Sequence, residues 1–170
     1  MKNLMKTVAG LVALMGLVLL SGCSKNTKVI SGPSNTFVLS VQPTNGAVNV
    51  PISSALQIIF TSPMDTSSVA QNFCLVAGEM MYQVMDSLEH SMMDYGEMME
   101  WMHSSSFPGH FQWNSKRDSC LFLPDSSLAY HTEYMIYMGR NMESTHRDMM
   151  MEHREMMGKD FITHFTTEDN

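Results

Sequence analysis

The chain has 170 residues, of which 44% are hydrophobic and 16% are charged, and its formal net charge at pH 7 is −7. This length is enough for one domain with a hydrophobic core of its own. An acidic chain without a basic cluster argues against nucleic acid as a partner, and it suits a cationic ligand better.

The first 22 residues have the features of a secretory signal peptide. Met1–Lys6 is short and basic, and Val8–Leu20 is an apolar run that is too short to span a membrane comfortably. The ending Leu20-Ser21-Gly22-Cys23 resembles the bacterial lipobox, in which the cysteine is acylated and becomes the new N-terminus. An ordinary signal peptide with a chance cysteine is the alternative.

The lipobox resemblance implies a lipoprotein of the cell envelope that is anchored to a membrane through Cys23. The next residue is Ser24 rather than Asp, a pattern typical of the outer membrane in Gram-negative bacteria. Residues 23–36 are rich in Ser, Asn, Lys, Gly and Pro, which predicts a flexible tether between the acylated cysteine and a domain at 37–170. Without residues 1–22 the chain keeps eight basic against seventeen acidic side chains, a net charge of about −9.

Short strands follow the tether, separated by turn residues such as those of Pro43–Gly46 and Asn114–Asp118. About seven strands without crossover helices predict an all-β antiparallel sandwich. The expected strands are Phe37–Val41, Ala55–Phe60, Phe73–Val76, Phe111–Trp113, Ser119–Leu123, Glu133–Met138 and Phe161–Thr166.

Several short motifs follow one another along the chain. They are the opening Gln42–Pro51, the strand and turn Ile59–Asp65, the late hairpin Leu121–Leu128 with Tyr130–Tyr137, and the closing strand Phe161–Thr167. Their order resembles the bacterial Ig-like domain named after the surface-layer protein SbsA. The resemblance implies an Ig-like sandwich that serves as a spacer or adhesion module, without an enzymatic site.

The chain departs from this family in two insertions, at about 78–109 and 140–159, where short connections are expected. Loops between strands are where function is usually grafted onto a scaffold. The chain has twenty Met, and eight of them lie in Met80–Met102 and eight in Met135–Met157. The two insertions are therefore the candidate functional segments.

The first insertion is predicted to form an amphipathic helix, because its apolar residues repeat at spacings of three and four. Gly96 interrupts the pattern and is a point at which the helix could break in two. The opposite face is acidic, and the segment has no Lys or Arg. The apolar stripe consists of Met81, Met85, Leu88, Met92, Tyr95, Met99 and Met102.

The second insertion shows the same spacing with histidines between the methionines, which predicts a second helix. One face of that helix would present thioether sulfurs and imidazoles together. Thioethers bind Cu(I) and Ag(I) well and hard cations poorly, and imidazole binds copper in either oxidation state. The expected ligands are His146, Met149, Met150, His153 and Met157, with Met142 and Met156 beside them and with Met85, Met92, Met99, Met102 and His103 of the first insertion if the two insertions meet.

Other functions remain open at this point. A Met stripe at helical spacing also serves as core or as an adaptable docking surface, so the chain could be a non-catalytic module that binds another envelope protein. An enzyme is disfavoured, because no nucleophile motif, phosphate loop or zinc signature is present. His131 and His164 lie in or near framework strands, where a structural role is expected.

Cys74 and Cys120 are expected to be separate thiols rather than a disulfide. Strand alternation places Cys74 on the face opposite to Phe73, whereas Cys120 shares its face with the inward Phe122. Opposite facings disfavour the short Cα separation and converging Cβ vectors that a disulfide needs.

Overall fold

The computed structural model describes residues 37–170 except 79, 81, 84–85, 87–93 and 149–150, and at 146–148 and 151–155 it describes the backbone alone. The signal peptide, Cys23 and the tether lie outside the described residues. The expected domain boundaries therefore stay predictions.

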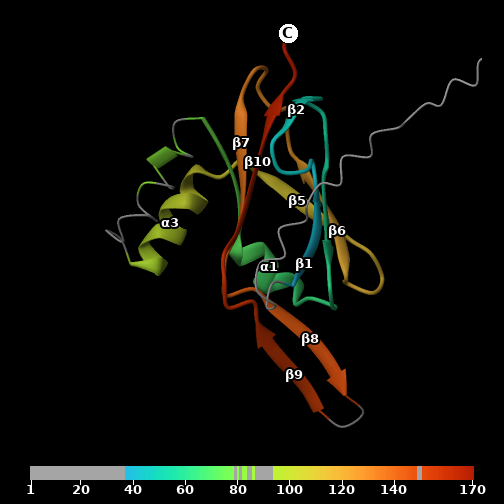
Figure 1. The fold of residues 1–170 in the computed structure, drawn as a ribbon. Coiled ribbons are helices and arrows are strands. Elements are labelled where there is room, and N and C mark those ends of the chain that lie inside the picture. Colours follow the sequence, from blue (N-terminus) through green and yellow to red (C-terminus); the bar gives the residue numbers. More distant parts are fainter. Residues whose placement is uncertain (1–36, 79, 81, 84–85, 87–93, 149–150) are drawn as a thin grey trace, which may run out of the picture. The chain divides into compact units, whose positions relative to one another are not determined.

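The described chain forms two four-stranded sheets and a separate two-stranded one (Figure 1). The strand orders are β1-β3-β6-β5, β2-β10-β7-β4 and β8-β9, and every pair is antiparallel except β10 with β2. The bounds are β1 Val38–Gln42, β2 Ala47–Val50, β3 Leu56–Phe60, β4 Phe73–Ala77, β5 Gly109–Trp113, β6 Ser119–Pro124, β7 Glu133–Met138, β8 Glu143–Asp148, β9 Met151–Met156 and β10 Phe161–Thr167, with helices α1 Thr66–Asn72 and α3 Tyr95–Ser105.

The main core lies between the two four-stranded sheets. In β3 the side chains of Leu56, Ile58 and Phe60 are buried while Gln57 is exposed. This alternation is typical of a strand with one face in the core and the other exposed to solvent. The inward residues of both sheets form a single hydrophobic cluster, as expected of a sandwich. The prediction of an all-β sandwich is confirmed, but the prediction that it is antiparallel is wrong for one pair, because β2 and β10 are parallel.

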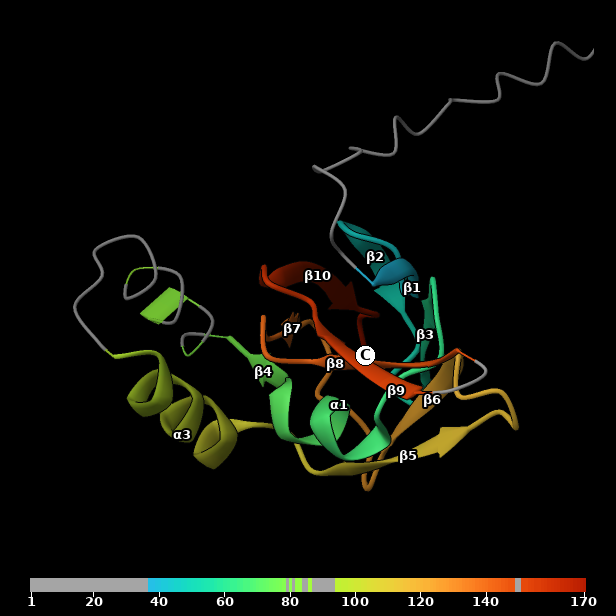
Figure 2. The same cartoon turned by 90° about the horizontal axis from the view of Figure 1, so that it is seen from below.

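Strand β7 is buried on both faces, because α3 covers the outer face of its sheet (Figure 2). Tyr134 and Ile136 belong to the main core, whereas Met135 and Tyr137 belong to a second cluster beneath α3. A strand covered on both sides has no polar alternation. The uninterrupted apolar run Tyr134–Met138 in the sequence reflects the burial of this strand on both faces.

All seven expected strands are present, with ends that shift by up to two residues. The edge strand β2 was not expected. It is short, its Val48 side chain is 67% exposed, and Asn49 adopts a positive φ of 57°. An exposed edge strand with a left-handed residue lacks the pattern by which strands are recognised in sequence.

Helix α1 was also not expected, although its start has a clear local cause. The Asp65 carboxylate accepts hydrogen bonds from the backbone N–H groups of Ser67 and Ser68, both at 2.9 Å. This capping satisfies two of the N–H groups that a helix start leaves without partners. The helix is seven residues long and buries Val69 and Asn72.

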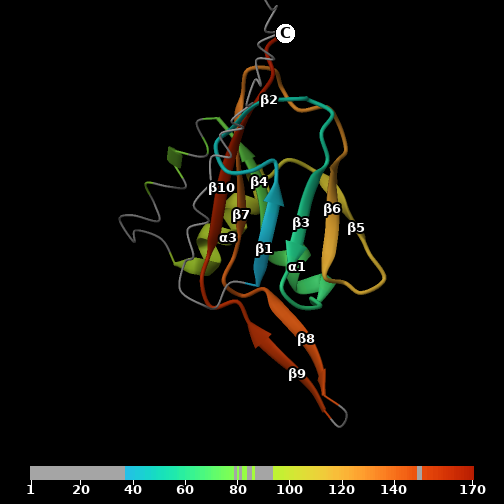
Figure 3. The same ribbon diagram turned by 45° about the vertical axis from the view of Figure 1, so that its right-hand side comes forward.

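The second insertion forms the antiparallel hairpin β8–β9, and the prediction of a helix there is wrong (Figure 3). Met142 and Met157 at its two ends are fully buried in the main core. A helix would separate residues 15 apart by about 22 Å, whereas the sandwich takes in both side chains at one place. The burial of both ends of the segment in the core outweighs the helical preference that the methionine spacing indicates.

The first insertion is helical where the spacing predicted a helix, but the helix starts later. Asp94 caps α3 by accepting a hydrogen bond from the Gly96 N–H at 2.8 Å. Gly96 therefore lies in the first turn of α3 and does not divide it. The described residues Met80, Tyr82, Gln83 and Asp86 are helical as well, while the expected ligands Met85 and Met92 lie outside the described residues.

Candidate functional site

The base of the β8–β9 hairpin is fixed to the sandwich by backbone and side-chain hydrogen bonds. Arg140 donates from its backbone N, Nε and Nη2 to the Asp160 carboxylate at 2.6–3.1 Å. Between Arg140 and Asp160 in the sequence, the Met157 N–H donates to the Met142 carbonyl at 2.8 Å. The hydrogen bond from the guanidinium to Asp160 raises the pKa of Arg140, so the guanidinium stays charged.

The hairpin register brings the two histidines of the second insertion opposite each other. His146 pairs with His153, and Ser144 pairs with Glu155. In an antiparallel ladder, directly opposite residues are nearest neighbours on the two strands. Met149 and Met150, two of the expected ligands, lie outside the described residues between the strand ends Asp148 and Met151.

The structure places four of the expected metal ligands among core residues rather than on an exposed helical face. Met142 and Met157 are 0% exposed in the main core. Met99 and Met102 are 7% and 0% exposed in the cluster between α3 and the sheet. Their apolar surroundings are typical of packing, which was the alternative reading of the Met stripe.

Methionine packing covers the outer face of the sheet beneath α3. Met98, Met99 and Met102 belong to one cluster with Cys74 and Val76 of β4 and with the outward side chains of β7. His103, a further expected ligand, follows this stripe, and its ring Nε2 lies 2.7 Å from the Gln71 carbonyl oxygen. The helix is thereby joined to α1 as well as to the sheet.

An open pocket of about 820 Å³ lies where both insertions meet α1. Met99 of the first insertion and Met156 of the second both line it, so residues of the two insertions come together at this pocket. Met156 is 64% exposed. The carboxylates of Asp65 and Glu143 also line the pocket, and among its described lining residues there is no Lys, Arg or His.

Amide and hydroxyl groups form much of the remaining pocket wall. Asn72 is 8% exposed, and its Nδ2 donates to the Ser68 carbonyl at 2.9 Å. The Tyr95 hydroxyl lies 3.5 Å from the Asn72 Oδ1, a long contact that leaves this oxygen capacity for another donor. Gln71 and Asn141 complete the set of amides.

Tyr95 holds α3 against the base of the hairpin. The Arg140 guanidinium lies 4.9 Å from the centre of its ring, a cation–π contact. The Tyr95 hydroxyl occupies the space beside Gly139 that a Cβ atom would fill. Burial is the largest cause that raises the pKa of Tyr95, followed by the negative charge of Asp160, so its hydroxyl remains protonated at neutral pH.

Sequence reasoning did not find the pocket. Asp65 had a visible signal, because Asp before Thr-Ser-Ser is a typical helix N-cap. Asn72, Asn141 and Glu143 carry no such signal. These residues come from three segments that only the fold brings together.

The histidines of the framework pair with carboxylates near the surface. His110 Nδ1 lies 3.1 Å from Asp125 Oδ1, and His131 Nδ1 lies 2.6 Å from Asp169 Oδ1. No group of three or more His, Cys, Asp or Glu able to hold a metal ion exists within the described part of the chain. This absence does not extend to sites that include Met sulfur, because thioethers also bind soft ions.

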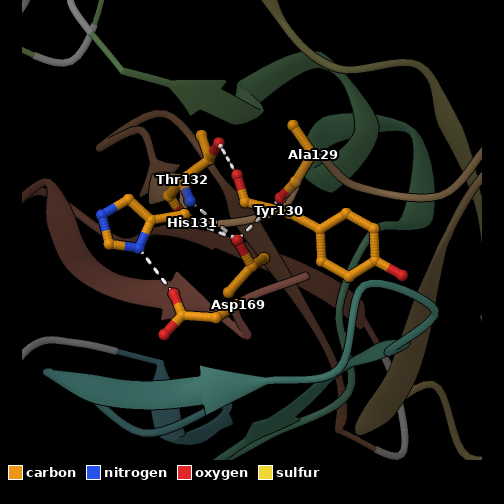
Figure 4. A network of polar contacts seen from close by, with 6 residues as sticks. Ala129, Tyr130, His131, Thr132 and Asp169 are labelled. Carbon is orange, nitrogen blue, oxygen red and sulfur yellow. Dashed lines mark hydrogen bonds and ion pairs between the residues drawn. The ribbon is translucent and has the colours of Figure 1, made fainter.

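The contacts around His131 are structural in character (Figure 4). The Thr167 hydroxyl donates to the Ala129 carbonyl at 2.7 Å and accepts from the Thr132 N–H at 2.9 Å. The His131–Asp169 contact lies at the edge of this network, and both side chains are more than three-quarters exposed. The network joins the end of β10 to the start of β7, which agrees with the structural role expected of His131.

Cys74 and Cys120 are free and buried, which confirms that they are separate thiols. Cys74 lies in the cluster beneath α3 and Cys120 in the main core, on opposite sides of a sheet layer. Burial raises the pKa of each thiol to about 12. Reactive cysteines have a lowered pKa, so neither is a candidate nucleophile.

These two thiols predict how stability depends on alkaline pH. Each pKa is raised from 9.0 to about 12, so the stabilisation is complete below pH 9 and is lost as the pH rises to 12. We expect the free energy of unfolding of the wild type to fall more steeply over this window than that of a Cys74→Ala/Cys120→Ala variant, as measured by urea denaturation at each pH. Equal slopes would contradict the buried position of the thiols.

None of the helices in the described segments is long and apolar enough to cross a membrane.

Comparison with known proteins gives one family and several distant structures. The family model described as a bacterial Ig-like domain matches residues 34–167. None of the curated proteins matches the chain.

Three solved structures illustrate the distant likenesses. L,D-transpeptidase 1 from Mycobacterium tuberculosis is 18% identical with a TM-score of 0.40, covering 79% of this chain and 40% of that one. Domains 1–6 of surface layer protein SbsC are 11% identical with a TM-score of 0.40, covering 77% and 13%. The copper resistance protein PcoC from Escherichia coli is 14% identical with a TM-score of 0.43, covering 77% and 98%. The chain thus spans less than half of the transpeptidase, and likenesses this distant say nothing about function.

Proposed function

The chain belongs to the bacterial Ig-like domain family, and from this premise we propose that it is a non-catalytic envelope lipoprotein whose second insertion binds Cu(I) or Ag(I). The sandwich is the scaffold, and the β8–β9 hairpin is the part that acts. The lipid anchor at Cys23, the outer-membrane location and the SbsA type of the domain belong to the same proposal.

The observation that carries the proposal is the hairpin register. His146 and His153 are directly opposite each other in the register, and in the sequence Met149 and Met150 lie between the two strands, with Met151 as the first residue of β9. Two imidazoles on neighbouring strands beside several thioethers are a ligand set suited to a soft monovalent ion. In a hairpin, residues directly opposite each other on the two strands are neighbours, so the two histidines come together without the helix that the spacing predicted.

The role of the core methionines differs from that of the hairpin. Met142 and Met157 are buried at the hairpin base, where they anchor it to the sandwich. In this proposal the ion is held by His146, Met149, Met150 and His153, whereas the methionines of α3 serve packing.

The test compares Cu(I) affinity of the full-length protein in detergent with that of a His146→Ala/Met149→Leu/Met150→Leu/His153→Ala variant, using a competing chelator. We expect the variant to lose more than tenfold in affinity, because it keeps no imidazole or sulfur at these positions. Its melting should stay cooperative, since the hairpin is held at its base by other residues.

A matched control removes two histidines from the framework instead. The His110→Ala/His164→Ala variant should bind Cu(I) as tightly as the wild type, because both residues belong to framework strands and not to the second insertion. If the wild type binds Cu(I) and Ag(I) no better than Zn(II), or if the hairpin variant binds as well as the wild type, the metal proposal fails.

The second candidate is a structural or adhesion module that docks on another envelope protein. The exposed apolar side chains of the insertions favour it, since Tyr82 is 62% and Met156 is 64% exposed. Absence of soft-metal binding by the full-length protein would leave this candidate as the better account of the insertions.

A further inference from the structure

The outer face of the sheet β1-β3-β6-β5 carries no formal charge. Along each of these strands the more exposed side chains alternate with more buried ones, apart from the irregularity in β1. Protein surfaces usually carry charged side chains at about a quarter to a third of their positions. The outward residues here are all uncharged, with His counted as neutral: Leu39, Ser40, Gln42, Gln57, Ile59, His110, Gln112, Ser119, Leu121 and Leu123. We propose that two copies of the chain contact each other through this face.

The centre of the face is apolar. Leu121 of β6 is 37% exposed, and in the register it lies between Gln57 of β3 and Gln112 of β5. Leu39 of β1 is 64% exposed, and Ile59 of β3 is half-buried. Apolar side chains with uncharged polar neighbours are typical of the centre of a protein–protein interface, from which charged residues are depleted.

The described helices pack elsewhere on the sandwich. Helix α3 covers the outer face of the other sheet, against β4 and β7 (Figure 2). Helix α1 contributes Val69 to the core between the sheets and lies near β7. Figure 3 shows β1, β3, β6 and β5 side by side. Within the described part of the chain, the outer side of this sheet is therefore open to a second molecule.

The two ends of the face carry opposite charges. The turn between β5 and β6 contains the basic Lys116 and Arg117 and the acidic Asp118, so its net charge is +1. Asp125 follows β6 at the other end, about 17 Å away for five residues of strand, and makes that end negative. These charges lie at the rim of the face, where charged residues of interfaces are usually found.

The rim charges favour one orientation of the two copies. A two-fold axis in the plane of the contact and perpendicular to the strands would set the turn of one copy against Asp125 of the other, at both ends of the interface. An axis parallel to the strands would set like charges against each other instead. The first arrangement is therefore the one that we propose.

A second copy fits this face because the face is complementary to itself. The formal net charge of the chain is −7, so two copies repel each other across most of their surfaces. An uncharged face with opposite charges at its ends is where they can meet without this repulsion. Four strands at a spacing of about 4.8 Å make the face about 19 Å wide, which is small for a permanent dimer, so we expect reversible association.

Sedimentation velocity of the full-length protein in non-ionic detergent, with a copper chelator present, tests the proposal. The chelator excludes dimers that a metal ion would hold together, so the result does not depend on the metal proposal. We expect a monomer–dimer mixture in which the dimer fraction rises with protein concentration. A wild type that stays monomeric at every concentration, or that forms a fixed larger oligomer, would overturn the proposal.

Leu121→Glu and Ile162→Glu are matched variants for this experiment. Their side chains are 37% and 36% exposed, and they lie on the outer faces of different sheets. Leu121→Glu sets like charges near each other at the centre of the contact and should raise the dimer dissociation constant about tenfold or more, whereas Ile162→Glu should leave it unchanged. Both should still melt cooperatively, because neither side chain is buried in the core. Equal dissociation constants for the two variants would contradict the proposed contact.

A charge reversal tests the orientation. Either Lys116→Glu or Asp125→Lys alone sets like charges against each other at both ends of the contact and should weaken the dimer about threefold at low salt. The two substitutions together restore opposite charges and should return the dissociation constant towards the wild-type value. A combined variant that dimerises more weakly than either single variant would show that these ends do not meet, and would overturn the proposed arrangement.

Discussion

Replacing Met142 by Ala is expected to lower the free energy of unfolding by about 2 to 5 kcal/mol. Met142 is 0% exposed and belongs to the main core at the point where the β8–β9 hairpin leaves the sandwich. The shortened side chain would leave a cavity, and the surrounding strands can close it only in part. Urea denaturation of the full-length protein in detergent measures the change.

The conservative replacement Met142→Leu is the control for this prediction. It keeps nearly the same volume and should cost less than about 1.5 kcal/mol. It also removes the sulfur, so it separates packing from metal binding: Cu(I) affinity should stay at the wild-type value. A large loss of affinity in a stable Met142→Leu variant would return Met142 to the ligand set and contradict its assignment to the core.

Replacing Gly139 by Ala is expected to destabilise the protein by about 1 to 3 kcal/mol through overpacking. A Cβ atom there would collide with the Tyr95 hydroxyl and approach Asn72 Oδ1 to 3.2 Å. Tyr95 is held on its ring by Arg140 at 4.9 Å, so it cannot move without loosening α3 from the hairpin base. Thermal and urea denaturation measure the loss.

The matched glycine is Gly96, which lies in the first turn of α3. A Cβ atom there would meet only the side chain of Asp94, at 3.2 Å. Because Ala is a better helix former than Gly, Gly96→Ala should be neutral or stabilising by up to about 1 kcal/mol. If both variants lost the same stability, the close approach of Tyr95 to Gly139 would not be the cause.

The two predictions concern the same feature, the attachment of the insertions to the sandwich. Met142 fixes the hairpin from within the core, and Tyr95 fixes α3 to the hairpin base. Tyr95 also lines the pocket, so weakening its contact with the hairpin base should alter the pocket wall.

The framework was determined by the sequence itself. Strands such as Leu56–Phe60 and Phe161–Thr167 carry alternating or continuous apolar residues between turn signals. This local pattern predicts strands, and the folded protein has strands at these positions. The same alternation separated Cys74 from Cys120, since each residue of a strand faces the side opposite to its neighbours. Local periodicity was sufficient for these features because each strand has to bury one face.

The shape of the second insertion was decided only by tertiary structure. The spacing of Met142, His146, Met149 and His153 satisfies a helix, yet the segment pairs as a hairpin. The residues that make up this spacing have different roles. Met142 and Met157 belong to the core, while the two histidines lie opposite each other further along the hairpin. The need to bury both ends at one place selects the hairpin, and no local pattern contains that condition.

The pocket was likewise beyond the reach of the sequence. Asp65, Tyr95 and Glu143 are far apart in the chain, and they meet because α1, α3 and the second insertion lie at one junction of the fold. The sequence determined which residue types the insertions carry, and hence the chemistries open to them. Tertiary packing decided which methionines became core and which remained at the surface, because burial depends on the neighbours that the fold supplies.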